Sequence, residues 1–188
     1  MNTLAEIDKI IFFFINQSLS NPITDFLMPI VTSFRSWLPL YILGILYLLL
    51  RFKSKGLYIL IVLLFAVGLC DLINAQLLKE YFLRVRPCRA LDNVNLLINC
   101  GAGHSFPSNH AVNNFAAATV LSYFFQRKIG ILFFFASLVA LSRVFVGVHY
   151  LSDILIGGIE GVIIGSIILY IVNKFDYNQS VKERVRIN

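Results

Sequence analysis

Three short segments of the sequence concentrate the residue types that can bind and process a phosphate group. Together they hold three cations, two imidazoles, a hydroxyl and a carboxylate. Cations gathered in an apolar chain need a polyanion to neutralise them, and phosphate suits both the planar fork of arginine and the point charge of lysine. The residues are Lys79 and Arg86, then Ser108, Asn109 and His110, and finally Arg143, His149 and Asp153.

The composition places this chemistry in a membrane. Of the 188 residues, 58% are hydrophobic and 14% are charged, and the mean hydropathy is +0.78. Soluble domains are about 45–50% apolar and about 25% charged, so a soluble fold of this length would leave too much apolar surface uncovered. The net charge of +6 does not indicate a nucleic-acid partner, because the basic residues lie between apolar runs rather than in one patch. The oligomeric state stays open.

Uncharged runs predict an all-α polytopic membrane helix bundle with five to six transmembrane helices and an N-terminal interfacial helix. Residues 4–19 are amphipathic and predict the interfacial helix, and residues 22–34 predict either a re-entrant piece or a sixth span. Runs shorter than about 20 residues can still cross the bilayer when flanking Lys and Arg side chains snorkel. The five firm runs are 36–50, 56–70 with a polar extension to 79, 105–126, 129–142, and 154–173.

We expect a single membrane-embedded domain over residues 1–188. Its parts are interfacial or re-entrant helices (1–35), two spans (36–78), an outer loop (79–107), three spans (108–173) and a cytoplasmic tail (174–188). Alternating spans place the basic connections at 51–55 and 127–128 on the same side as the tail, and such loops are cytoplasmic. This predicts a multi-pass protein of the cytoplasmic (inner) membrane whose three chemistry-bearing segments face the periplasm or exterior. The basic tail residues are Lys174, Lys182, Arg184 and Arg186.

Ser108 falls where the third span begins. Its hydroxyl and the free backbone amides of Asn109 and His110 would form an anion-binding helix N-terminus. Because all three segments then meet at one lipid–water boundary, the predicted function is phosphoryl chemistry on an amphiphilic substrate.

The three segments resemble the signature motifs of the type 2 phosphatidic acid phosphatase superfamily in order and in internal spacing. The first is Lys79-Glu-Tyr-Phe-Leu-Arg-Val-Arg86-Pro87, and the second is Pro107-Ser108-Asn109-His110. A three-part match with fixed spacings is far more specific than one short motif. The third runs from Ser142-Arg143 through Gly147 and His149 to Asp153.

This resemblance implies a role for each residue. His149 would attack phosphorus and become a phosphohistidine, while Asp153 accepts a hydrogen bond from its other ring nitrogen. His110 would protonate the leaving oxygen and then activate water. No metal and no cofactor would be required. The phosphoryl oxygens would be held by Lys79, Arg86, Ser108, Asn109 and Arg143.

The resemblance also implies a lipid substrate, which is a phospholipid, a glycolipid or a polyprenyl phosphate. Lipid A 1-phosphate, undecaprenyl diphosphate and phosphatidylglycerophosphate are all compatible with the sequence. A non-catalytic channel or lipid-binding protein would explain the helices but not the His149/Asp153 pair. Vanadate-dependent haloperoxidases of the same superfamily are soluble. A zinc site is also conceivable, but no close pair of its ligands would have zinc-finger or zincin spacing. Its ligands would be His104, His110, His149, Asp153 and the two loop cysteines, Cys88 and Cys100.

Four residues of the outer loop fall outside the motif positions. For Arg84 and Arg89, contact with a headgroup or with solvent is the favoured interpretation. Cys88 and Cys100 could form a disulfide in an oxidising compartment, and the sequence leaves this pairing open.

Two features inside the last span predict packing rather than chemistry. Glu160 lies on the same helix face as Asp153 and about 10 Å deeper, and we expect it to hydrogen-bond Asn113 or Asn114. Glycines recur every four residues and predict a smooth stripe for close helix packing, at positions 157, 161 and 165.

Overall fold

The computed structural model describes residues 3–175, and the regular structure in that range is helical throughout. Lys174 lies in the last turn of the final helix, whereas Lys182, Arg184 and Arg186 lie outside the described residues. The elements are α1 (Thr3–Phe13), η1 (Phe14–Ser18), α2 (Pro22–Thr32), α3 (Phe34–Phe52), α4 (Ser54–Ile73), η2 (Asn74–Leu78), α5 (Lys79–Phe82), α6 (Pro87–Ala90), α7 (Asn109–Phe124), η3 (Gln126–Lys128), α8 (Ile129–Phe145) and α9 (Leu151–Phe175).

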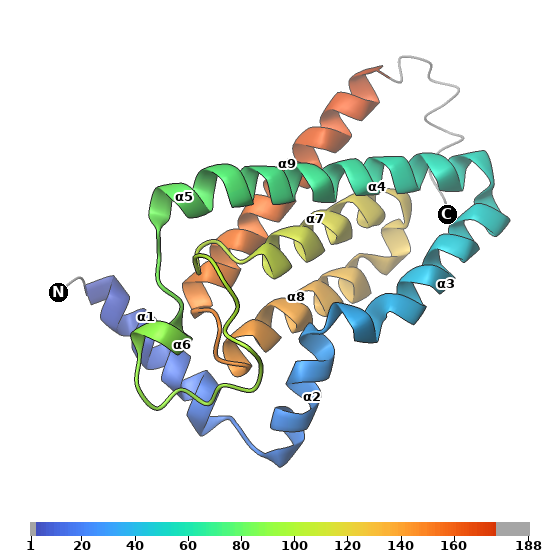
Figure 1. Ribbon diagram of the computed structural model, residues 1–188. Coiled ribbons are helices and arrows are strands. Elements are labelled where there is room, and N and C mark those ends of the chain that lie inside the picture. Colours follow the sequence, from blue (N-terminus) through green and yellow to red (C-terminus); the bar gives the residue numbers. More distant parts are fainter. Residues whose placement is uncertain (1–2, 176–188) are drawn as a thin grey trace.

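Helix α7 is the centre of the bundle and packs against α4, α8 and α9 (Figure 1). Its closest neighbour is α9, because the predicted glycine stripe faces it. A Cβ atom at Gly161 would lie 2.2 Å from the Val112 carbonyl oxygen, and one at Gly157 would lie 2.9 Å from the Ser108 carbonyl oxygen. The stripe is therefore confirmed as a close backbone contact between α7 and α9.

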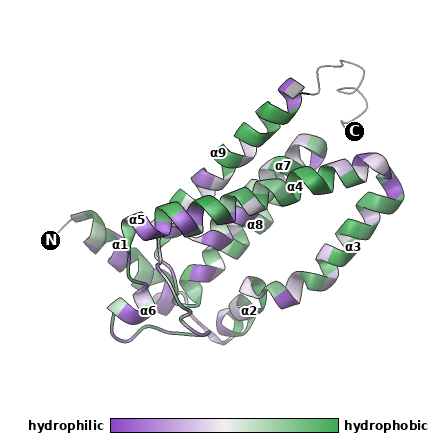
Figure 2. Cartoon of the chain, turned by 45° about the horizontal axis from the view of Figure 1, so that its top comes forward, coloured by the Kyte–Doolittle hydropathy of each residue, from purple (hydrophilic) through white to green (hydrophobic). Residues whose placement is uncertain are grey.

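The lengths and surfaces of the helices are those of a multi-pass membrane protein. Four segments are long and apolar enough to cross a membrane, namely Phe34–Phe52, Ser54–Ala90, Gln126–Phe145 and Leu151–Lys174. Hydrophobic residues predominate along the long helices (Figure 2). Large apolar side chains are exposed on them, as at Leu64 and Phe65. Helix α7 runs among these spans with 16 residues. Helix α2 has 11 residues and is about 16 Å long, which is too short to cross about 30 Å of hydrocarbon.

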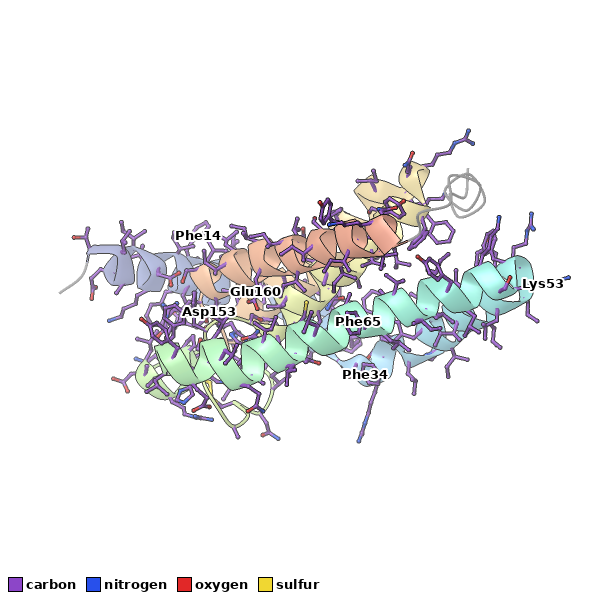
Figure 3. The ribbon with its side chains drawn as sticks, turned by 90° about the horizontal axis from the view of Figure 1, so that it is seen from above. Phe14, Phe34, Lys53, Phe65, Asp153 and Glu160 are labelled. Atoms are coloured by element: carbon purple, nitrogen blue, oxygen red, sulfur yellow. A yellow bond between two sulfur atoms is a disulfide. The ribbon has the colours of Figure 1, made fainter. Side chains whose placement is uncertain are left out.

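The connections between the spans fall at two opposite ends of the bundle. Lys53, between α3 and α4, lies at one end, and Asp153 lies at the other (Figure 3). The basic element η3 joins α7 to α8 at the Lys53 end. The long loop after α5 and the short connection between α8 and α9 lie at the Asp153 end (Figure 1). The structure thus confirms the alternation of spans that the sequence predicted.

Helix boundaries shift where polar residues interrupt the apolar runs. Helix α4 continues through the π-helical turn η2 into α5, so Lys79 belongs to one long helical segment. Helix α7 begins at Asn109, four residues later than the apolar run at 105, because Ser108, in the position before the helix, has an extended backbone. Helix α9 begins at Leu151, which places Asp153 in its first turn.

The N-terminal segment is bound to the Asp153 end of the bundle. The Asn16 side chain is fully buried in this segment. Its Nδ2 donates to the carbonyl oxygens of Asn95 at 2.9 Å and of Phe145 at 2.8 Å. The Asn16 side-chain oxygen accepts from the Asn95 amide at 2.9 Å. Phe12 is fully buried one turn earlier, while Ile10 is exposed. One face of α1 is therefore part of the core beneath the site.

Candidate active site

His149 lies in the short connection between α8 and α9. The chain can turn there because Gly147 has a φ of +85°, which is accessible to glycine. A Cβ atom at Gly147 would also lie 2.8 Å from a Val94 side-chain carbon and 2.9 Å from the Asn95 carbonyl oxygen. This close approach to the outer loop buries His149, which is only 2% exposed.

The Asp153 carboxylate orients the His149 ring. Asp153 is fully buried, and its Oδ2 lies 3.3 Å from His149 Nδ1. The same oxygen accepts a hydrogen bond from the Tyr150 amide at 2.9 Å and another from the Ser105 hydroxyl. A carboxylate at Nδ1 holds the proton on that nitrogen, which leaves the lone pair on Nε2.

Burial keeps His149 uncharged. Removal from water lowers the pKa of His149 to about 4, and the nearby guanidinium groups of Arg143 and Arg86 act in the same direction. The hydrogen bond and negative charge of Asp153 oppose this shift only in part. At neutral pH the ring is therefore a neutral imidazole with a free Nε2 lone pair, which is the form that can attack an electrophile.

The N-terminus of α7 adds an anion site beside this pair. Ser108 is fully buried, its amide donates to the Asp153 carbonyl oxygen at 3.1 Å, and its hydroxyl has no partner within residues 3–175. The first amides of a helix also lack intrahelical acceptors. Asn109 contributes through its backbone, because its side chain donates to Asp71 at 3.0 Å. His110 interacts electrostatically with His149 and lies within this turn.

Three cations from separate elements converge on the same place. Lys79 donates to the His104 carbonyl oxygen at 3.1 Å, and Arg143 donates to the Thr32 hydroxyl at 2.6 Å. Arg86 makes only long contacts of 3.4 and 3.5 Å with two carbonyl oxygens of the outer loop. Lys79 interacts electrostatically with both arginines and with Asp153.

This cation cluster is incompletely neutralised. Arg143 is 7% exposed and Arg86 is 9% exposed, and the Arg143 Nε has no partner within the described residues. Buried cations that repel one another are costly unless an anion joins them. Together with the unpaired Ser108 hydroxyl, the unused donors define a site for a phosphate-like oxyanion.

Arg84 is not simply solvated, which was one of its two expected interpretations. Its Nη1 donates to Asp153 Oδ1 at 2.6 Å and its Nη2 donates to Asp8 Oδ2 at 2.6 Å. The guanidinium carbon also lies 4.0 Å from the centre of the Tyr150 ring. Arg89 donates to the carbonyl oxygens of the loop at 101 and 103. Both arginines thus bind groups of the protein at the Asp153 end of the bundle.

Thr32 is a second residue that the sequence did not reveal. It is 7% exposed at the end of α2, where its hydroxyl accepts a hydrogen bond from Arg143 and its backbone lies near the His110 ring. No local motif marks this threonine. It shares the site only because the fold brings α2 against α8.

Glu160 does not make the contact that we expected. Both carboxylate oxygens are buried without a hydrogen-bond partner within residues 3–175. The candidate partners are engaged elsewhere, because Asn113 donates to Asp71 at 2.9 Å and Asn114 donates to the carbonyl oxygen of His110 at 2.8 Å. The side-chain amides of Asn113 and Asn114 therefore donate to α4 and to their own helix rather than to Glu160 on α9.

The outer loop is closed by a disulfide between Cys88 and Cys100. This bond settles the pairing that the sequence left open. It also removes both thiols from the zinc alternative, since disulfide sulfurs cannot act as thiolate ligands. The loop that it closes precedes the carbonyl groups at 102 and 103 that contact Arg86.

Known proteins share both this fold and this site region. The chain is 26% identical to the lipid A 4′-phosphatase of Porphyromonas gingivalis over 172 residues, covering 88% of this chain and 72% of the relative. The crystal structure of LpxE from Aquifex aeolicus matches with a TM-score of 0.72 and 30% identity, covering 87% of this chain and 95% of that one. A phosphatidylglycerolphosphate phosphatase of the PAP2 type from Bacillus subtilis matches with a TM-score of 0.75 and 25% identity, covering 95% and 90%.

The fold and the oxyanion site define a membrane-embedded, all-helical lipid phosphatase. The family model described as the PAP2 superfamily matches residues 39–177, which is most of the chain. The protein therefore belongs to the PAP2 superfamily, and the resemblance drawn from the three motifs is confirmed.

Proposed function

We propose that the protein hydrolyses the terminal phosphate of a membrane lipid through a phosphohistidine formed on His149. The observation that carries this proposal is the neutral, buried His149 held by Asp153 next to unneutralised cations. Burying a charged carboxylate beside an imidazole costs free energy. A channel or a passive lipid-binding protein would gain no function from that pair.

The first step transfers the phosphoryl group to the protein. Nε2 of His149 attacks phosphorus, the bond from phosphorus to the lipid oxygen breaks, and His110 gives a proton to that leaving oxygen. Asp153 keeps the proton on Nδ1 and stabilises the positive charge that develops on the ring. The phosphoryl oxygens are held by Lys79, Arg86, Arg143, the Ser108 hydroxyl and the Asn109 amide.

The second step releases inorganic phosphate. His110, now neutral, accepts a proton from water, the resulting hydroxide attacks phosphorus, and the bond from phosphorus to Nε2 of His149 breaks. His149 returns to its neutral form and His110 to its protonated form. These steps use only side chains and amides of the chain, so the proposal includes no metal ion and no cofactor.

The substrate that we propose is a lipid with an exposed phosphate at the outer face of the inner membrane. A site at the end of the spans suits a headgroup whose acyl or prenyl chains remain in the bilayer. Lipid A phosphates are favoured by the name of the Porphyromonas gingivalis relative, with undecaprenyl diphosphate and phosphatidylglycerophosphate as the other candidates. The Cys88–Cys100 disulfide supports an outer location, because such bonds persist in oxidising compartments.

The proposed activity is tested by phosphate release from these three lipids by purified protein in detergent. We expect turnover of at least one lipid, near-complete loss in His149→Gln, and unchanged turnover in His104→Gln, a matched substitution in the outer loop. EDTA should leave turnover intact, and vanadate should inhibit, because it mimics the five-coordinate phosphorus of the transition state. Wild-type rates in His149→Gln would refute the phosphohistidine, and turnover abolished by EDTA would refute the metal-free steps.

The proposed orientation is tested by thiol labelling in intact cells. Asp92 in the outer loop and Ser54 at the start of α4 are exposed at opposite ends of the bundle. With the native cysteines replaced, a membrane-impermeant maleimide should label Asp92→Cys and spare Ser54→Cys. The reverse pattern would place the site on the cytoplasmic side.

A further inference from the structure

Arg84 connects two carboxylates at the site. Its side chain is 27% exposed, and its two terminal nitrogens donate at 2.6 Å to Asp153, which is fully buried, and to Asp8, whose side chain is 10% exposed. A third bond of 2.7 Å joins Arg84 to the Ser152 hydroxyl. With both terminal nitrogens engaged and the Tyr150 ring against its guanidinium, Arg84 has its donors committed to protein acceptors.

Asp8 fixes this arrangement from another helix. Its Oδ1 accepts from the Ser152 amide at 3.1 Å, and its Oδ2 accepts from the Ser152 hydroxyl and from Arg84. Ser152 is in the first turn of α9, one residue before Asp153. Asp8 thus caps the helix that carries Asp153 and also orients the guanidinium that pairs with Asp153.

We infer that Asp8 and Arg84 are positioning residues for the His149–Asp153 pair, so that the N-terminal helix α1 is a required part of the catalytic machinery. The inference rests on the proposed role of His149. Asp8 lies before residue 39, where the family match begins, so this contribution comes from a part of the chain outside that match.

The physical reason is that an orienting carboxylate must be both charged and fixed. Asp153 is withdrawn from water, and without a cationic partner a carboxylate in such a place takes up a proton or moves. A protonated Asp153 could not hold the His149 proton on Nδ1, and the nucleophile would lose its orientation. Other charged groups near Asp153 are Lys79 and Arg86, but these belong to the cluster that faces the phosphate.

The geometry also predicts how the effects of substituting Arg84 and Asp8 combine. Arg84 contacts Asp153 directly, whereas Asp8 acts largely through Arg84 and through the first turn of α9. Removing Arg84 should therefore remove the part of the Asp8 effect that passes through Arg84, and leave only the part that passes through Ser152. Two substitutions that act through one contact give non-additive effects.

The test compares kcat, KM and pH profiles of Arg84→Gln, Asp8→Ala and the double variant with a lipid that the wild-type protein hydrolyses. We expect kcat to fall about 10- to 100-fold in each single variant with KM changed by less than about threefold, as for residues that support a catalytic group. The double variant should lose clearly less than the product of the two single-variant losses. The acid limb of kcat/KM should move to higher pH in Arg84→Gln, because the carboxylate has lost its cation.

Conservative variants separate positioning from folding. Arg84→Lys should recover part of kcat, since lysine can supply the charge but cannot bridge both carboxylates. Glu6→Gln is the matched control, because it removes a carboxylate from the same helix without touching Arg84, and it should behave as wild type. Size-exclusion elution and thermal unfolding in detergent report the folded fraction.

Several outcomes would overturn the inference. One is a wild-type kcat in Arg84→Gln, and another is a loss of kcat in the double variant that equals the product of the two single losses. A third is a loss of kcat that disappears when the rate is divided by the concentration of folded protein. If Arg84→Gln does not fold, the inference is tested with Asp8→Asn, which removes the negative charge of Asp8 with little change in shape. An unchanged kcat in Asp8→Asn would overturn the inference. A wild-type protein inactive on every lipid would instead refute the proposed function, and the inference with it.

Discussion

Lowering the pH should leave His149 uncharged far below the range in which a histidine ordinarily takes up a proton. With a pKa of about 4, the ring is about 90% neutral at pH 5, whereas a histidine with a pKa of 6.5 would be only about 3% neutral. The unfolded chain binds that proton near 6.5, so the free energy of unfolding should also decrease as pH falls from about 6.5 toward 4.

The direct measurement is a ¹⁵N NMR titration of histidine-labelled protein in detergent micelles. The chain has only three histidines, so His104→Gln and His110→Gln variants assign the His149 ring signals. Asp153→Asn is an informative control, because Asp153 raises the pKa of His149 and its neutralisation should lower that pKa further. A His149 midpoint near 6.5 in the folded protein would refute the argument that burial keeps the nucleophile neutral.

Three other perturbations test the architecture around the site. Gly161→Leu should lower the thermal unfolding temperature in detergent markedly, because even a Cβ atom would lie 2.2 Å from a carbonyl oxygen of α7; an unchanged temperature would contradict the close packing. Thr32→Val should raise KM about 10-fold through loss of the hydroxyl that holds Arg143, and an unchanged KM would show that Arg143 needs no such support. Cys88 and Cys100 should resist alkylation without reductant, and reduction should destabilise the protein by about 3 kcal/mol, from the entropy of the loop of about a dozen residues; two alkylatable thiols would disprove the bond.

The sequence predicted those parts of the site that short-range spacing encodes. Lys79 and Arg86, Ser108 and His110, and His149 and Asp153 each lie in one segment, and each segment carries residue types with a specific chemistry. Apolar runs predicted the spans, and the count of crossings between the segments predicted that they meet at one end.

The contacts that the sequence could not predict join segments far apart in the chain. Arg84 and Asp8 are 76 positions apart, and no spacing rule relates them. One signal was present, because Asp8 shares a helix face with Phe12 and Ile15, which are both buried. A carboxylate on the buried face of an amphipathic helix requires a cation, and α1 would then be a core helix on that side rather than only an interfacial one.

For Glu160, the sequence predicted the helix face but not the hydrogen-bond partners. Helical periodicity placed it correctly on the Asp153 side of α9, but side-chain partners depend on rotamers and on the neighbouring helix. Asn113 had a carboxylate available on α4, at Asp71, and bonds to it instead.

The glycine contact between α7 and α9 divides the site into two mechanical parts. Because these helices touch backbone to backbone, the helix start at Ser108 and the first turn of α9 at Asp153 are held in direct contact. The cations Lys79 and Arg86 belong to a different part, because Lys79 lies at the end of the helical segment that continues α4 and Arg86 lies just before the disulfide-closed loop. In the proposed mechanism, the α7–α9 contact would keep His110 at a constant distance from the first turn of α9, whichever lipid headgroup the cations hold.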